Sequence, residues 1–130
     1  MTDPKQVVRR FLEAFSIGDL DAVAAGLTED ATWWVSGRIE GMSGTNSKVA
    51  LLALLEAVKP LYVEGALRIT PDAMIAEGPI VACEARSYAT LTNGRVYANQ
   101  YHFLFEVAGE KLRRVREYSD TQHMLETFGA

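Results

Sequence analysis

The sequence has one cysteine, no excess of basic residues and no long hydrophobic run. Because Cys83 is the only cysteine, no disulfide can form within the chain, which favours a reducing compartment. The 13 Lys and Arg against 17 Asp and Glu give a net charge of −4. This balance argues against a nucleic-acid partner, since no basic stripe could neutralise phosphates. The longest apolar run, 49–58, contains Glu56 and is far shorter than the ~20 residues of a membrane span.

The patterns of a secretion signal, a metal site and a phosphate loop are also missing. The first ten residues, MTDPKQVVRR, lack the apolar core of a signal peptide. The two histidines, His102 and His123, belong to no His, Cys and Asp set with the spacing of a zinc site. The segment GMSG at 41–44 has no following lysine. We therefore expect a cytoplasmic protein that acts without a membrane, a metal or a cofactor.

What the chain does have is the composition of an ordinary globular protein. Hydrophobic residues make up 48% of its 130 residues and charged residues 23%, so a disordered or disulfide-stapled chain is excluded. A chain of this length buries roughly two-thirds of its unfolded surface. We expect residues 1–130 to form a single domain with its own core.

Helical signals dominate the first half of the chain and strand signals the second. Asp3 and Asp19 can cap two helices, and Asn46 or Thr45 can cap a third. The glycine-rich segment 36–47 predicts a loop. Strands are predicted at 31–35, 67–76, 80–92, 96–107 and 111–119, and a final short helix at 120–128. Helices followed by antiparallel strands predict an α+β domain.

The strongest turn signal is Asn93-Gly94, which predicts a two-residue hairpin. In that register Glu84 lies opposite Phe103 and Arg86 lies opposite Tyr101, on one side of the sheet. The aromatic bulk of this side predicts that it packs on the helices, with both charges carried into the interior. Because such burial is costly, a site explains the two charges better than packing does. The alternative is that this side faces water.

The same register divides the small side chains of this hairpin between the two sides of the sheet. Ala82 lies opposite Phe105 on the aromatic side, whereas Cys83 and Ala85 lie on the other side. A face of small residues would be left wet in a monomer. We therefore expect a homodimer that forms through this outer face.

The next hairpin has two possible registers. A two-residue turn at Gly109-Glu110 would place Tyr118 beside the aromatic row, together with two arginines. A three-residue loop at 108–110 would place Val115 and Glu117 there instead. Only the three-residue loop brings a second carboxylate toward the charges on the neighbouring strand.

Four strings and their order resemble the nuclear transport factor 2-like superfamily, and most closely its SnoaL-like and ketosteroid-isomerase-related members. The strings are VVRRFLEAFSIGDLDAV, EDATWWVSG, YANQYHFLFEV and VREYSDTQHMLETFG, which together span most of the chain. The resemblance implies a cone-shaped, strongly curved sheet, mixed or antiparallel, wrapped around three N-terminal helices with a short C-terminal helix. It also implies a pocket at the open end and a homodimer through the outer face.

The resemblance further implies roles for single residues. Glu117 falls where SnoaL-like polyketide cyclases have their acid/base aspartate. In limonene epoxide hydrolases an arginine and an aspartate two apart on a strand activate water with a last aspartate; here Glu84 and Arg86 occupy the strand positions with the charges exchanged. The helix-1 tyrosine of ketosteroid isomerases falls near Phe11 or Phe15, which carry no hydroxyl.

Together these patterns predict a site and three functions. The expected catalytic residues are Glu117 as acid or base, with Glu84 and Arg86 tuning its pKa. The expected substrate-binding residues are Tyr101, Asn99, Tyr88, Phe103, Trp33, Trp34, Phe15 and Val115, with one tryptophan inside and one outside. The first function is cofactor-independent acid/base catalysis (isomerisation, hydration or hydrolysis, or cyclisation) on a small, largely apolar molecule. The alternatives are a ligand-binding module without turnover and a dimeric interaction domain with a filled cone.

Overall fold

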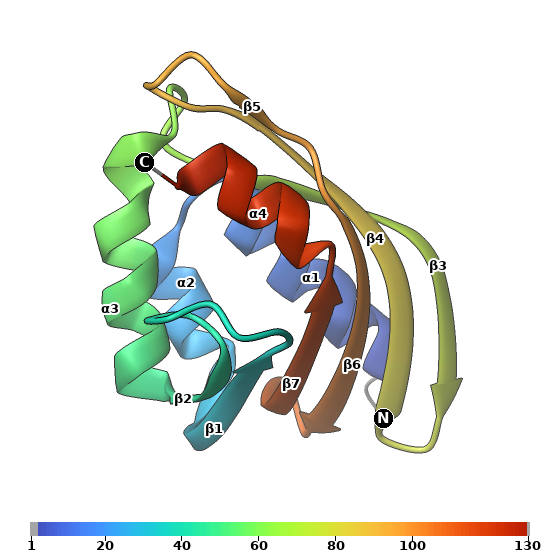
Figure 1. The fold of residues 1–130 in the computed structure, drawn as a ribbon. Coiled ribbons are helices and arrows are strands. Elements are labelled where there is room, and N and C mark those ends of the chain that lie inside the picture. The colour runs from blue at the N-terminus through green and yellow to red at the C-terminus, as the bar shows by residue number, and fades with distance from the viewer. Residues whose placement is uncertain (1–2, 130) are drawn as a thin grey trace.

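The computed structural model describes residues 3–129, in which a curved sheet wraps around helices (Figure 1). The helices are α1 (Pro4–Ser16), α2 (Leu20–Ala25), α3 (Lys48–Val58), the 3-10 helix η1 (Lys59–Leu61) and α4 (Thr121–Phe128). The strands are β1 (Leu27–Val35), β2 (Gly44–Ser47), β3 (Arg68–Glu77), β4 (Ile80–Thr90), β5 (Val96–Tyr97), β6 (Gln100–Ala108) and β7 (Lys111–Ser119). The expected α+β class is confirmed.

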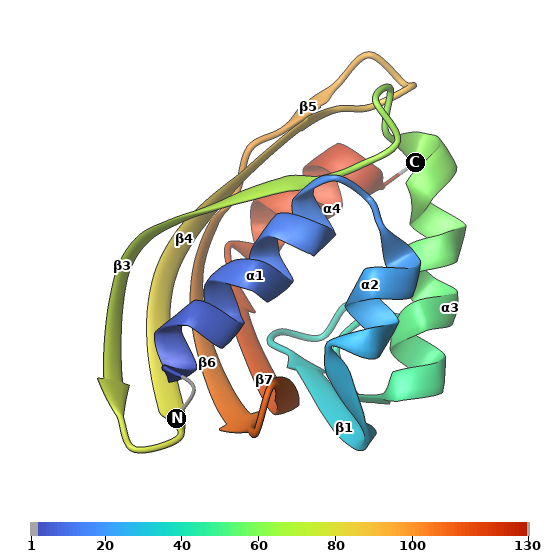
Figure 2. The same cartoon turned by 180° about the vertical axis from the view of Figure 1, so that it is seen from behind.

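The sheet is mixed and strongly curved. Its strands lie in the order β2-β1-β7-β6-β4-β3, with β5 paired to β4, and β1 with β7 is its parallel pair. Helix α1 lies in the concave side of the sheet, and α3 stands across from it, as Figures 1 and 2 show. This arrangement confirms the expected cone. Among residues 3–129, no helix is both long enough and apolar enough to cross a membrane.

Side-chain caps fix where the helices begin. The side chains of Asp3, Asp19 and Asp120 each accept a hydrogen bond from a backbone N–H in the first turn of a helix. The cap of α3 is Ser47, not Asn46 or Thr45 as expected, because β2 continues to Ser47 through a segment predicted to be a loop. The Asn46 amide instead donates to the carbonyl oxygen of Trp33 on β1.

The register between β4 and β6 differs by one residue from the predicted one. The turn holds three residues, 92–94, because the N–H of Leu91 bonds the carbonyl oxygen of Arg95 at 2.8 Å. Gly94 takes a φ of +87°, the left-handed conformation that closes such three-residue loops. Ala85 therefore pairs with Tyr101, and Cys83 with Phe103.

This one-residue difference reverses the facing of every side chain on β4. Cys83 and Ala85 lie inside, 0% and 4% exposed, beside the aromatic side chains of β6. Glu84 and Arg86 are exposed on the outer side, so the prediction that they enter the interior is wrong. The small residues from which a homodimer contact was expected lie inside the fold and cannot form one. Small side chains on β4 leave room for large ones on β6.

The β6–β7 hairpin combines parts of both predicted registers. Its turn has two residues, Gly109-Glu110, since Ala108 pairs with Lys111. A β-bulge then inserts Arg113 into β7, because Val107 pairs with Leu112 but Glu106 with Arg114. Beyond the bulge Glu117 pairs with Phe103 and faces inward, and Tyr118 faces outward. Of the two possible loops the two-residue turn is the one observed, but the bulge gives Glu117 the inward facing that was expected with the three-residue loop.

Candidate functional site

A cavity of about 200 Å³ opens between the concave face of the sheet and helices α3 and α4. Its wall is mostly apolar, from Phe15 on α1, Trp33 and Val35 on β1, Leu51 and Leu55 on α3, and Met124 and Phe128 on α4. The polar side chains in the wall are Glu117, Tyr62, Tyr97 and Tyr101. An apolar cavity of about 150 Å³ can hold benzene, so this one has room for a small ring-containing molecule.

Glu117 is the charged group of this cavity. Its Oε1 accepts a hydrogen bond of 3.0 Å from the indole Nε1 of Trp33, and its Oε2 has no hydrogen-bond partner within residues 3–129. Burial raises the pKa of the Glu117 carboxyl from 4.5 to about 7, while the Trp33 hydrogen bond opposes this rise. At neutral pH both the acid and the carboxylate are therefore populated, which suits a group that takes and returns protons.

Two neighbouring strands position this carboxyl. Glu117 pairs with Phe103 on β6 and with Val35 on the parallel strand β1. Trp33 lies two residues before Val35 on the same face of β1, which brings its indole N–H to Oε1. The Trp33 ring is held in turn against Phe15, with ring centroids 6.2 Å apart, and against the edge of Phe103. The acid is thus fixed by regular structure rather than by a loop.

Two tyrosine hydroxyls in the wall are held by a buried polar cluster. Tyr101 Oη lies 2.9 Å from both Tyr97 Oη and Ser87 Oγ. The side-chain amide of Asn99 donates to Tyr97 Oη at 2.9 Å, and its backbone N–H donates to Ser87 Oγ at 3.2 Å. Burial raises the pKa of both tyrosines, so their hydroxyls keep their protons.

Helix α4 closes one side of the cavity with Met124 and Phe128. Its first turn is tied to the sheet because the Asn99 amide donates to the carbonyl oxygen of Asp120 at 3.1 Å. Its last turn is tied to the β4–β5 hairpin because Arg95 donates to carbonyl oxygens at the C-terminal end of the helix. Both ends of this wall are therefore anchored.

The predicted site residues fall into three groups. Those that line the cavity are Glu117, Trp33, Phe15 and Tyr101. Those buried around it, without lining it, are Phe103, Val115 and Asn99. Those on the outer side of the sheet are Glu84, Arg86, Tyr88 and Trp34. One tryptophan is inside and the other outside, as predicted, but the trio of Glu117, Glu84 and Arg86 is not brought together.

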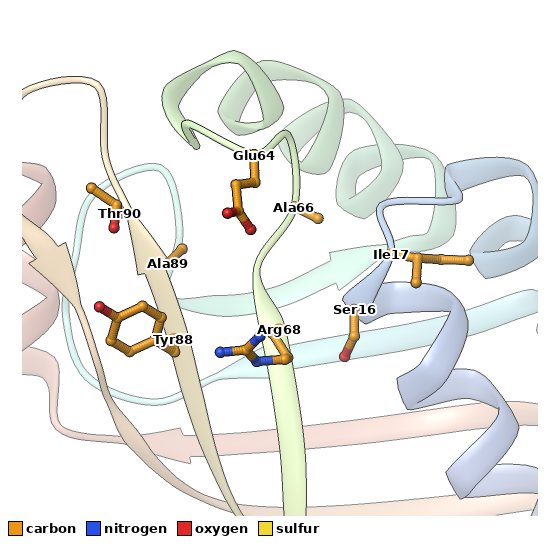
Figure 3. Close-up of a pocket in the computed structure, with 8 residues that line it drawn as sticks. All are labelled: Ser16, Ile17, Glu64, Ala66, Arg68, Tyr88, Ala89 and Thr90. Atoms are coloured by element: carbon orange, nitrogen blue, oxygen red, sulfur yellow. The ribbon is translucent and has the colours of Figure 1, made fainter.

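The outer residues have surface partners of their own. Arg86 forms an ion pair of 3.0 Å with Asp72 on β3. The guanidinium of Arg116 stacks on Trp34 at 4.0 Å from the ring centroid. Tyr88 lies beside Arg68 at a polar depression of about 250 Å³, whose lining residues, Glu64 among them, are drawn in Figure 3. The prediction that Tyr88 lines the inner pocket is therefore wrong.

Sequence reasoning missed two hydroxyls of the cavity, those of Tyr62 and Tyr97. Tyr97 is four residues before Tyr101 in the predicted strand 96–107, so periodicity places both on the same side and its facing was available from the sequence. Tyr62 follows η1 in a non-periodic stretch, and no sequence pattern indicates where its ring lies.

Replacing Trp33 with phenylalanine should raise the pKa of Glu117 above its value of about 7. The variant removes the N–H that stabilises the carboxylate, while the ring still fills the wall. The measurement is a titration of the Glu117 carboxyl carbon by NMR. Trp34→Phe is the matched control on the outer face and should leave the midpoint where it is. A midpoint that falls in Trp33→Phe would contradict the assigned hydrogen bond.

Comparison with known proteins identifies the family. The SnoaL-like domain family matches residues 8–115. An NTF2-like protein of unknown function from Burkholderia pseudomallei has a similar structure, with 25% identity, all of both chains covered and a TM-score of 0.82. IdmH, a putative polyketide cyclase from Streptomyces antibioticus, is 19% identical over 99% of this chain and 100% of its own, with a TM-score of 0.80.

A further similar structure is BvnE pinacolase from Penicillium brevicompactum, 19% identical over 92% of this chain and 86% of its own, with a TM-score of 0.80. No curated protein matches the sequence. The resemblance to the nuclear transport factor 2-like superfamily is confirmed by the fold and by these comparisons. With more than half of its residues matched by one family, the chain belongs to the SnoaL-like domain family.

Proposed function

We propose that this protein is a cofactor-independent enzyme, an isomerase or cyclase, in which Glu117 moves protons on a small and largely apolar molecule. The observation that carries the proposal is the Glu117 carboxyl itself. One of its oxygens is held by Trp33, the other has no partner within the described residues 3–129, and its pKa is raised to about 7 inside an apolar cavity.

The chemistry follows from the two carboxyl oxygens. Oε1 stays bound to the Trp33 indole N–H, so the carboxyl keeps its orientation while Oε2 takes a proton from the substrate and returns it at another atom. The mostly apolar wall lowers the local polarity, which strengthens each electrostatic contact with the reacting group. A carboxyl with a pKa near the working pH is an efficient base and, once protonated, an efficient acid.

Proteins of similar structure support small-molecule chemistry. One is described as a putative polyketide cyclase, one as a putative isomerase and one as a pinacolase, and TerC was crystallised with polyporic acid. Since these chains are 18–19% identical to this one, they support the reaction class and not a substrate.

The test is proton exchange at the carbon next to a carbonyl group. We expect the protein to accelerate deuterium uptake by the small bicyclic ketone 1-indanone in heavy water, followed by NMR. Glu117→Gln should lower this rate by about 10²-fold or more, the usual scale for the loss of a positioned proton-transfer group. Affinity for the ketone should change far less. The matched control Glu84→Gln, on the outer face, should leave the rate unchanged.

A binding module without turnover is the second candidate, and one observation favours it. Among residues 3–129 no arginine or lysine pairs with Glu117, whose one polar partner is Trp33. In that case the ketone would bind but exchange hydrogen for deuterium no faster than in buffer.

The open cavity argues against the third function, an interaction domain with a filled cone. The outward facing of Glu84 and Arg86 removes the charged trio that epoxide hydrolysis would need.

A further inference from the structure

The polar cluster of Ser87, Tyr97 and Tyr101 has one more hydroxyl proton than the hydrogen bonds between these three groups require. Three hydroxyl groups, those of Ser87, Tyr101 and Tyr97, form a row with two contacts, each of 2.9 Å. Each contact takes one proton, so two of the three hydroxyl protons are used. The third must point away from the row.

Asn99 cannot accept that third proton. Its side-chain amide donates one hydrogen to Tyr97 Oη and the other to the carbonyl oxygen of Asp120. Its amide oxygen accepts from the backbone N–H groups of Gln100 and Asp120. All four hydrogen-bonding positions of the side chain are therefore occupied, which fixes its orientation and makes Tyr97 Oη an acceptor.

The position of Ser87 decides where the spare proton goes. Ser87 is 5% exposed and borders an outer depression beside Arg86 and Gln100 rather than the cavity, so an unshared proton there would be a nearly buried donor without a partner among residues 3–129. Ser87 therefore donates to Tyr101. The unshared proton is then on Tyr97 or Tyr101, and both of these side chains line the cavity.

We propose that Tyr97 and Tyr101 form a hydrogen-bond donor subsite for a carbonyl oxygen of the ligand, in the same cavity as Glu117. The inference rests on the proposed function, because it places the substrate among carbonyl compounds. It assigns Asn99 and Ser87 a positioning role behind the tyrosines rather than a contact with the ligand. A donor held in place before the ligand arrives stabilises negative charge that develops on an oxygen when a neighbouring proton is removed.

Tyr62 is the competing donor. It lines the same cavity, and its hydroxyl has no hydrogen-bond partner within residues 3–129. Nothing there fixes the direction of its proton, whereas the tyrosine pair is ordered by Asn99 and Ser87. Tyr62→Phe is therefore the matched variant for the test.

The experiment compares 1-indanone with indane, which has a methylene group where 1-indanone has its carbonyl. Infrared spectroscopy records the carbonyl stretch of the bound ketone at about pH 9, where Glu117 is ionised and donates nothing. We expect a lower frequency than in hexane, as a hydrogen bond to the carbonyl produces. NMR titration gives the ratio of the two dissociation constants.

The number of hydroxyl protons that remain predicts the carbonyl frequency in each variant. Tyr97→Phe and Tyr101→Phe each leave one unshared hydroxyl proton at the cavity, so each keeps a lowered carbonyl frequency. The double variant removes both hydroxyls. It should return the frequency toward the value in hexane and reduce the preference for 1-indanone over indane by about tenfold, the cost of an unsatisfied buried carbonyl.

The possible outcomes separate the two proposals. A carbonyl frequency in the unmodified protein equal to that in hexane overturns the subsite, whether or not the double variant folds. If Tyr62→Phe, and not the double variant, abolishes the lowering of the carbonyl frequency, then Tyr62 is the donor and the proposed subsite is overturned. A lowered frequency without accelerated deuterium uptake supports the subsite and overturns turnover. Failure of both ligands to bind overturns both proposals.

Discussion

Glu117→Gln should remove a pH dependence of stability worth on the order of 3 kcal/mol. Burial raises the pKa of this carboxyl from 4.5 to about 7 in the folded protein. The folded state therefore binds more protons than the unfolded state between these two pH values, and stability falls as pH rises through this range. The contribution of Glu117 is fully present below about pH 4.5 and is lost above about pH 7. Glutamine has the same shape, can still accept the Trp33 hydrogen bond and does not ionise.

The measurement is urea denaturation at about pH 5 and about pH 8.5. We expect the variant to gain stability over the unmodified protein at the higher pH, and little or none at the lower pH. Glu84→Gln is the matched control at an exposed position and should follow the unmodified protein at both. If the difference in stability between Glu117→Gln and the unmodified protein does not change with pH, then Glu117 is not buried as described.

Ala85→Glu should destabilise the fold by about 4 kcal/mol or more. Ala85 is 4% exposed and pairs with Tyr101, so the larger side chain overpacks the interior and brings a carboxyl without a partner. Buried carboxyls of this kind reach pKa values several units above normal, which costs folding energy of this order. Thermal and urea denaturation measure the loss.

The same substitution on the other face of β4 is the control. Ala82→Glu adds the same group where β4 faces outward, opposite Leu104, and should change stability by less than about 1 kcal/mol. The register predicted from the two-residue turn would make Ala82→Glu the more destabilising variant, since it places Ala82 inside and Ala85 outside. Equal effects of the two variants would contradict both registers.

The β4–β5 turn shows why the site was only partly predictable. The glycine signal in Asn93-Gly94 is correct, since Gly94 takes the left-handed conformation, but it is the last residue of three rather than the second of two. Both loop types place a glycine at a left-handed position. The choice between them depends on how the whole strand packs, which no four-residue pattern contains. That single residue decided the facing of Glu84 and Arg86.

The inward facing of Glu117 was expected from the family resemblance alone, because local patterns left both registers of its hairpin open. In the sequence KLRRVREYS the apolar residues Leu112 and Val115 are three positions apart, so they do not follow one strand period and leave either facing of the acid open. The family resemblance selected the inward facing, and the structure achieves it with a bulge instead of a longer loop. No such long-range information was needed to predict the helix caps at Asp3 and Asp19 or the order of the elements.

Because of the bulge in β7, the length of the β6–β7 hairpin does not determine which way Glu117 faces. Arg113, the inserted residue, extends outward, and its Nε donates to Glu106 Oε2 on the opposite strand at 2.7 Å. Without this residue, Leu112 and Val115 would alternate regularly around one outward arginine, and Glu117 would still point inward. The hairpin can thus lose one residue at its exposed end while the geometry around Glu117 at its other end is kept. The exposed end of the β6–β7 hairpin can therefore change in length while the other end of the same two strands keeps the acid in place.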